Sequence, residues 1–169
     1  SSMSAVANDG ILMKPQFMRR AFDSRGKTVV SFNPKPVRRV VHSGVAKSLN
    51  KMLVSVVSNE GTATRARLSG FDVAGKTGTT KKLIEGRYSN RHHVASFVGF
   101  FPADDPKIVI TVVVDEPKMK KGLTGYGGSV AAPAFQRLGK KIIAYMGLKP
   151  NQPEGKSFAI TSEGQRSAL

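Results

Sequence analysis

Four consecutive residues, at positions 76 to 79, carry the groups needed to bind a carboxylate. Lys76 supplies a positive charge, and Thr77 and Thr79 supply hydroxyl donors. Gly78 lets a substrate approach the backbone closely. The residues follow a short β-type run, so that an extended substrate could lie along the strand. They are therefore interpreted as one wall of an acyl-transfer site, although the Lys-Thr-Gly tripeptide alone would also fit a strand end that enters a turn.

The residues around this tripeptide support the first interpretation. Related segments occur in a fixed order: Glu60-Gly61-Thr62-Ala63, then residues 75–82, Gly86-Arg87-Tyr88, and residues 98–102, 112–117 and 125–135. Together they resemble the division-type class B penicillin-binding proteins, the D,D-transpeptidases that cross-link septal peptidoglycan. Lys-Thr-Gly is one of three sequence elements found in penicillin-binding proteins and serine β-lactamases. The chain departs from the family pattern at Thr80, where alanine is more frequent, and at Gly125-Tyr126, where relatives often carry two aromatics.

The resemblance implies an α/β fold of the penicillin-binding protein and serine β-lactamase type, in which helices cover an antiparallel sheet. It implies that Lys76, Thr77, Gly78 and Thr79 bind a D-alanyl-D-alanine stem peptide or a β-lactam. Lys76 and Thr79 would be catalytic, since the backbone N–H of Thr79 would complete the oxyanion hole. The residues Thr80, Lys81, Tyr88 and Tyr126 are either at the pocket rim or plain loop residues.

A nucleophilic serine is the missing part. In the family it lies far upstream of Lys-Thr-Gly, whereas only 75 residues precede Lys76. Ser24 and Ser48 each begin a Ser-x-x-Lys match, which works when a helical turn brings a desolvated lysine onto the serine hydroxyl. Ser24 lies in a predicted turn, and Ser48 lies on the polar face of a predicted helix. We therefore expect that this chain lacks the nucleophile and is inactive alone.

The resemblance also implies the setting of the complete protein. It would be a peptidoglycan D,D-transpeptidase of septal wall synthesis that needs no cofactor and no metal. Its partners would be division-complex membrane proteins and a glycosyltransferase. A single-pass anchor upstream of this chain would hold the protein in the inner membrane, with the catalytic domain in the periplasm. Two alternatives stay open: a non-catalytic module of the same fold that binds peptide or division partners, and a serine β-lactamase relative.

Charge raises a further alternative. The 169 residues include 27 Lys and Arg against 11 Asp and Glu, which gives a net charge of +16. Because the basic residues are scattered and no recognition motif accompanies them, we expect no nucleic-acid binding. A basic surface would better suit anionic lipid head groups or wall polymers. No cysteine is present, which excludes disulfides and thiolate metal sites.

Periodicity predicts the elements that position these residues. We expect a helix end over residues 1–7 closed by Gly10, a hairpin of residues 17–22 and 27–32, an extended linker over 33–36, a helix over 44–58 capped by Ser43, strands over 70–80, 94–101 and 107–115, and a helix over 129–146. Short links predict that the three strands are antiparallel neighbours. Residues 81–91 are predicted to form a long exposed hairpin loop.

The last predicted helix would cover one face of the sheet. Its predicted apolar stripe comprises Val130, Ala134, Phe135, Leu138, Ile142 and Tyr145. Residues 1–150 are then expected to be the C-terminal part of a transpeptidase domain. Residues 151–169 lack any hydrophobic period and are expected to be a disordered tail.

Overall fold

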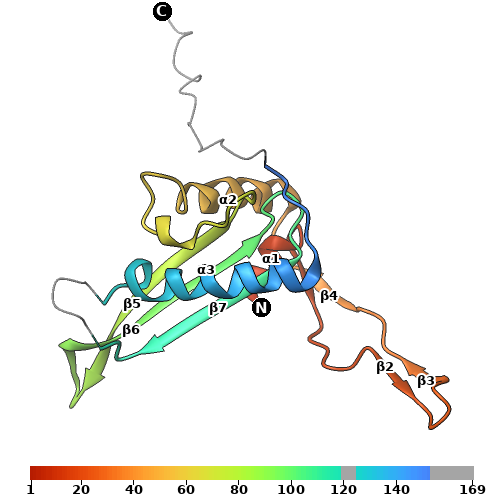
Figure 1. Ribbon diagram of the computed structural model, residues 1–169. Helices are drawn as coiled ribbons and strands as arrows, with labels where there is room; N and C mark the ends of the chain where they lie inside the picture. Colours follow the sequence, from red (N-terminus) through yellow and green to blue (C-terminus); the bar gives the residue numbers. More distant parts are fainter. Residues whose placement is uncertain (119–124, 153–169) are drawn as a thin grey trace, which may run out of the picture. The chain divides into compact units, whose positions relative to one another are not determined.

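The computed structural model describes residues 1–118 and 125–152 (Figure 1). The chain divides into two compact units, one over residues 1–50 and one that begins at residue 51. Within the described residues, no helix has both the length and the apolar character needed to cross a bilayer. Most of the predicted tail, residues 153–169, lies outside the described residues.

The first unit contains α1 (Ser2–Ala7) and two pairs of short strands, β1 (Ile11–Met13) with β4 (Pro36–Arg39) and β2 (Arg20–Phe22) with β3 (Thr28–Ser31). Strands β2 and β3 form the predicted antiparallel hairpin. In its turn, the Asp23 carboxylate accepts the N–H groups of Arg25 and Lys27, both at 2.9 Å. The sequence predicts only an extended linker where β4 pairs with β1. Pro36 begins that strand, where a missing N–H is tolerated.

Gly10 has the predicted left-handed φ, 82°, and its N–H donates to the carbonyl of Ala5 at 2.7 Å, which closes α1. Asp9 before it is also left-handed, with a φ of 54°. Helix α2 spans Ser43–Ser55 and is shorter than predicted. The helix does not continue through Val56, whose carbonyl accepts a hydrogen bond from the N–H of Ala63 at 2.9 Å. The predicted cap is one position off, because Ser43 is itself the first helical residue.

The second unit contains the 3-10 helix η1 (Thr64–Ala66) and the strands β5 (Ala74–Ile84), β6 (Arg87–Phe101) and β7 (Ile108–Asp115). The strands form one antiparallel sheet in the order β5-β6-β7, which confirms the predicted neighbours. The long loop predicted over residues 81–91 is wrong, since Glu85-Gly86 alone joins β5 to β6. Both residues have positive φ angles, 49° and 75°, as a two-residue hairpin turn requires.

Helix α3 (Gly127–Met146) lies across one face of this sheet (Figure 1). The rings of Phe97 and Phe135 meet edge to face beneath it, with centroids 4.8 Å apart. The predicted apolar stripe of α3 is wrong at Leu138 and Tyr145, which are 43% and 92% exposed. The residues buried along the helix are mostly small: Gly127, Ala131, Ala132, Phe135 and Gly139. Small side chains let the helix approach the sheet closely. The sequence prediction assigned the buried face by large apolar residues and therefore placed it wrongly.

Candidate active site

Strand β5 lies at the edge of the sheet, since within the described residues it pairs only with β6. The N–H of Glu116 donates to the carbonyl of His93 at 3.1 Å, which sets the hydrogen-bonded pairs of the β6–β7 ladder. Because such pairs alternate, the even-numbered residues of β6 direct their backbone groups to β5. Their partners on β5 are Ala74, Lys76, Gly78 and Thr80. The backbone N–H and C=O groups of Gly75, Thr77 and Thr79 therefore point away from β6, along the open edge.

The first turn of α3 holds the side chain of Thr79. The N–H of Gly127 donates to Thr79 Oγ1 at 3.2 Å. Only glycine fits there, because a Cβ on Gly127 would lie 2.2 Å from the carbonyl oxygen of Ser96 and 2.7 Å from that of Gly78. Since the Thr79 oxygen accepts this bond, its own O–H can still donate to a ligand.

Thr77 lies on the same face of β5 as Thr79, two residues away. Its Oγ1 is 3.2 Å from the Oγ1 of Thr62. Gly128 packs against this pair, since a Cβ there would lie 2.2 Å from the carbonyl oxygen of Thr62. When Thr62 donates within the pair, the Thr77 hydroxyl keeps its proton for a ligand. The two β5 threonines thus present two hydroxyl donors on one face.

Lys76 and Gly78 complete the edge. The exposed ammonium of Lys76 donates to the carbonyl of Thr77 at 3.1 Å, which brings its charge to the outward backbone groups. Gly78 makes room for its neighbour on β6, because a Cβ would lie 2.5 Å from the Oγ of Ser96. A positive charge, two hydroxyls and the outward N–H of Thr79 therefore line one strand edge. Such a set suits a carboxylate or a developing oxyanion.

Of the four predicted rim residues, the structure places only one beside these threonines. Tyr126, 59% exposed, directly precedes the helix whose first N–H holds Thr79. Thr80 is exposed on the opposite face of β5. Lys81 donates at 2.7 Å to a side-chain amide of the hairpin. The backbone of Tyr88 pairs with β5 near the hairpin tip, at a point about 13 Å along that strand from Thr79.

Three residues at the site received no role from the sequence: Thr62, Gly127 and Gly128. Thr62 contacts a residue 15 positions away, and Gly127 contacts one 48 positions away. Neither spacing follows from periodicity. The adjacent glycines just before the helix predicted over 129–146 were the one available signal, since glycine permits a close approach of backbones.

Comparison with known proteins identifies the family. The penicillin binding protein transpeptidase domain family matches residues 1–140 of the chain. The chain belongs to this family. A probable peptidoglycan D,D-transpeptidase of Neisseria gonorrhoeae is 34% identical over 150 residues, which cover 89% of this chain and 23% of that protein. The stage V sporulation protein D of Bacillus subtilis is 38% identical over 159 residues, covering 92% of this chain and 24% of that protein.

Solved structures of penicillin-binding transpeptidases confirm the predicted fold. Penicillin-binding protein 3 of Mycobacterium tuberculosis, complexed with ampicillin, matches with a TM-score of 0.76 and 28% identity, covering 92% of this chain and 35% of that one. The transpeptidase domain of penicillin-binding protein 3 from Burkholderia pseudomallei matches with a TM-score of 0.69 and 33% identity, covering 89% of this chain and 42% of that one. The chain spans about a quarter of the length of the curated relatives.

Neither Ser-x-x-Lys match of this chain has the geometry of a nucleophile. Ser24 is exposed in the turn of the β2–β3 hairpin. Ser48 and Lys51 are also exposed, as their helical positions predict. The Ser48 hydroxyl donates back to the carbonyl of Gly44 at 3.0 Å. Without a desolvated lysine, neither serine can lose its proton readily.

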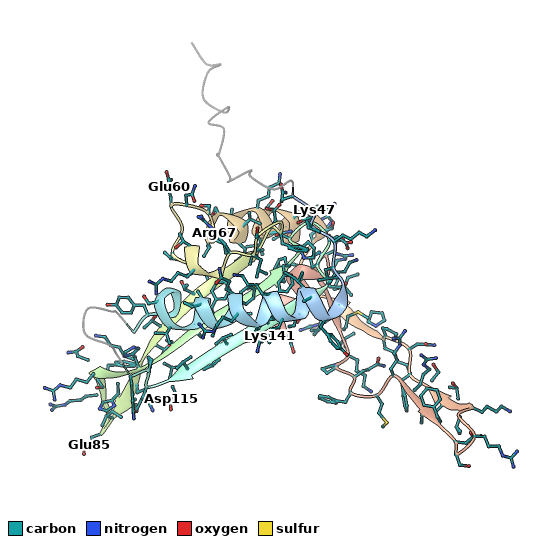
Figure 2. The ribbon with its side chains drawn as sticks, in the orientation of Figure 1. Lys47, Glu60, Arg67, Glu85, Asp115 and Lys141 are labelled. Carbon is teal, nitrogen blue, oxygen red and sulfur yellow. The ribbon has the colours of Figure 1, made fainter. Side chains whose placement is uncertain are left out.

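An ion-pair network lies at the hairpin end of the sheet. The ammonium of Lys82 is 2.7 Å from a carboxylate oxygen of Glu116 and 3.0 Å from one of Asp115. The hydrogen bond between Lys82 and Glu116 raises the pKa of the lysine and lowers the pKa of the glutamate. Figure 2 shows Asp115 at the end of β7 that lies toward Glu85 and the hairpin tip. The network therefore ties the end of β7 to the β5–β6 hairpin.

Proposed function

We propose that the open edge of β5 forms the carboxylate- and oxyanion-binding side of a serine peptidoglycan D,D-transpeptidase site. One observation carries this proposal: Thr79 combines an outward backbone N–H with a hydroxyl that the N–H of Gly127 holds at 3.2 Å. The nucleophilic serine would come from a segment outside this chain, because Ser24 and Ser48 lack a desolvated lysine partner.

A substrate would bind as an added strand along β5 and pair with the outward backbone groups of Thr77. Its scissile carbonyl would place its oxygen at the N–H of Thr79, which stabilises the charge that develops as the serine attacks. Its terminal carboxylate would accept hydrogen bonds from the hydroxyls of Thr77 and Thr79, in the field of Lys76. A D-alanyl-D-alanine stem peptide fits this description, and so does a β-lactam.

The relatives support this substrate class, since one is named a peptidoglycan D,D-transpeptidase and another was solved with ampicillin. In the complete protein, residues 1–150 would form the C-terminal part of the transpeptidase domain. The protein would cross-link septal wall together with division-complex membrane proteins and a glycosyltransferase. A single-pass anchor upstream of this chain would hold it in the inner membrane, with the catalytic domain in the periplasm.

Replacing Thr79 by proline in the full-length protein tests the oxyanion assignment. Proline deletes the N–H, and because that N–H points away from β6, the sheet loses no ladder bond. Acylation by a fluorescent penicillin should slow by about a hundredfold or more, the effect of losing one oxyanion donor. The control is Thr79→Ser, which keeps the N–H and the hydroxyl and should acylate normally.

Thr80→Pro supplies the structural contrast. The N–H of Thr80 points toward β6, so proline at that position should lower the melting temperature. Thr79→Pro should lower it less, because that variant loses the bond from the Gly127 N–H to Oγ1 but no ladder bond. A folded Thr79→Pro variant that acylates at the wild-type rate would show that this N–H does not bind the oxyanion.

A further inference from the structure

The first unit exposes an unusual number of large apolar side chains. They lie in residues 14–39, called here the basic arm, which includes the β2–β3 hairpin. Phe17 is fully exposed, and Met18 and Phe22 are 61% and 56% exposed. Single exposed apolar residues are ordinary, but a contiguous group indicates a surface that binds something.

The apolar residues at the base of the hairpin are contiguous. Phe17, Met18 and Phe32 line the same hollow of about 660 Å³. Lys14 and Lys35 line that hollow as well. A second hollow shares the three apolar residues and adds Arg19 and Arg20. Cationic side chains therefore border the apolar group.

The charge of the basic arm has one sign. It carries eight Lys and Arg residues and one acidic residue, Asp23. The Asp23 carboxylate is occupied by two backbone N–H groups of its own turn. No ion pair within the described residues involves the arm. One cation lies over an aromatic ring, with the Arg20 guanidinium 5.6 Å from the ring centroid of Phe22.

We propose that the basic arm docks on an anionic phospholipid bilayer. Arginine and lysine side chains would bind the phosphate head groups, and Phe17, Met18 and Phe22 would enter the boundary between head groups and acyl chains. An anionic bilayer complements both features at once, because it offers negative charge above an apolar layer. Nucleic acid would complement the charge but leave Met18 and the exposed valines of the hairpin in water. This inference goes beyond the proposed transpeptidase activity and does not depend on it.

Vesicle sedimentation with the 169-residue chain tests the proposal. One vesicle contains phosphatidylglycerol and phosphatidylcholine in equal parts, and the other contains phosphatidylcholine alone. Wild type should bind the anionic vesicles at least about tenfold more tightly. Arg19→Glu/Arg20→Glu should weaken this binding by at least about thirtyfold, since each basic residue near an anionic surface contributes roughly one kcal/mol and the glutamates add repulsion. Phe17→Ser/Met18→Ser should weaken it by about tenfold.

The matched control is Lys140→Glu/Lys141→Glu, which makes the same charge change at exposed positions of α3, where Figure 2 labels Lys141. It should change vesicle binding by less than about threefold. The proposal is overturned if this control binds as weakly as the arginine variant, since net charge alone would then explain the binding. Equal binding to both vesicles, wild-type binding by the Phe17→Ser/Met18→Ser variant, or equally tight binding to a DNA oligonucleotide would overturn it as well. Circular dichroism confirms that each variant is folded.

Discussion

Replacing Gly127 by alanine should disturb Thr79 without touching it directly. The added Cβ would lie 2.2 Å from the carbonyl oxygen of Ser96 and 2.7 Å from that of Gly78. Both oxygens belong to paired strands, so the start of α3 has to move by about 1 Å to reach an ordinary contact distance. The bond from the Gly127 N–H to Thr79 Oγ1, now 3.2 Å, would then exceed hydrogen-bonding range.

The size of the effect follows from three terms. Overpacking costs about 1–3 kcal/mol, and the lost hydrogen bond costs about 0.5–1.5 kcal/mol. Alanine recovers up to about 1 kcal/mol through its higher helix propensity. The free energy of unfolding should therefore fall by about 1–3 kcal/mol. Acylation should slow by about tenfold, because losing one hydrogen bond that orients Thr79 corresponds to about 1.4 kcal/mol.

The assay is acylation of the full-length protein by a fluorescent penicillin, at a temperature where circular dichroism shows each variant folded. Gly139→Ala is the control on the same buried face of α3. Its Cβ would meet the methyl groups of Leu68 at 3.0 Å, and a side chain can move, so acylation should stay unchanged. Thr79→Val deletes the acceptor without a clash, and since it also removes the hydroxyl donor, it should slow acylation at least as much as Gly127→Ala. A folded Gly127→Ala variant with wild-type acylation, or equal slowing by Gly139→Ala, would refute the role of α3.

Three further results are expected. Thr77→Val in the full-length protein should cost about 1.5–3 kcal/mol of transition-state stabilisation, with little change in melting temperature. If the Thr77 hydroxyl binds the substrate carboxylate, a substrate with that carboxylate amidated should not show this loss. Intact-mass analysis should show no covalent adduct when the present chain alone is incubated with penicillin. An adduct on Ser24 or Ser48 would contradict the inference that neither serine is the nucleophile. Lys82→Met should lower the melting temperature slightly at pH 7. That difference should fade at acid pH, as the pH falls from the ordinary pKa of glutamate through the lowered pKa of Glu116. It should also fade at alkaline pH, as the pH rises from the ordinary pKa of lysine through the raised pKa of Lys82.

Residue types directed attention to residues 76–79, because positive charge, hydroxyls and glycine follow each other there whatever the fold. The structure confirms the predicted strand, and its binding role is the proposal made above. Apolar runs likewise predicted β7 and the second half of β6, which pack in the core. The outer half of the β5–β6 hairpin was missed since its exposed residues carry no apolar alternation. The contacts of Thr77 with Thr62 and of Thr79 with Gly127 were also missed, because only tertiary packing brings these residues together.

The functional groups of the proposed site include backbone atoms, so the site depends on strand register as much as on residue types. A one-residue slip of β5 would turn the hydroxyls of Thr77 and Thr79 to the other face of the sheet. Two paired glycines oppose such a slip. A Cβ on Gly75 would lie 2.4 Å from the ring of Phe97, and one on Gly99 would lie 2.8 Å from a carbonyl oxygen of β5. Any other residue moved into these positions would clash with the core, so the packing that stabilises the sheet also fixes which N–H groups face its open edge.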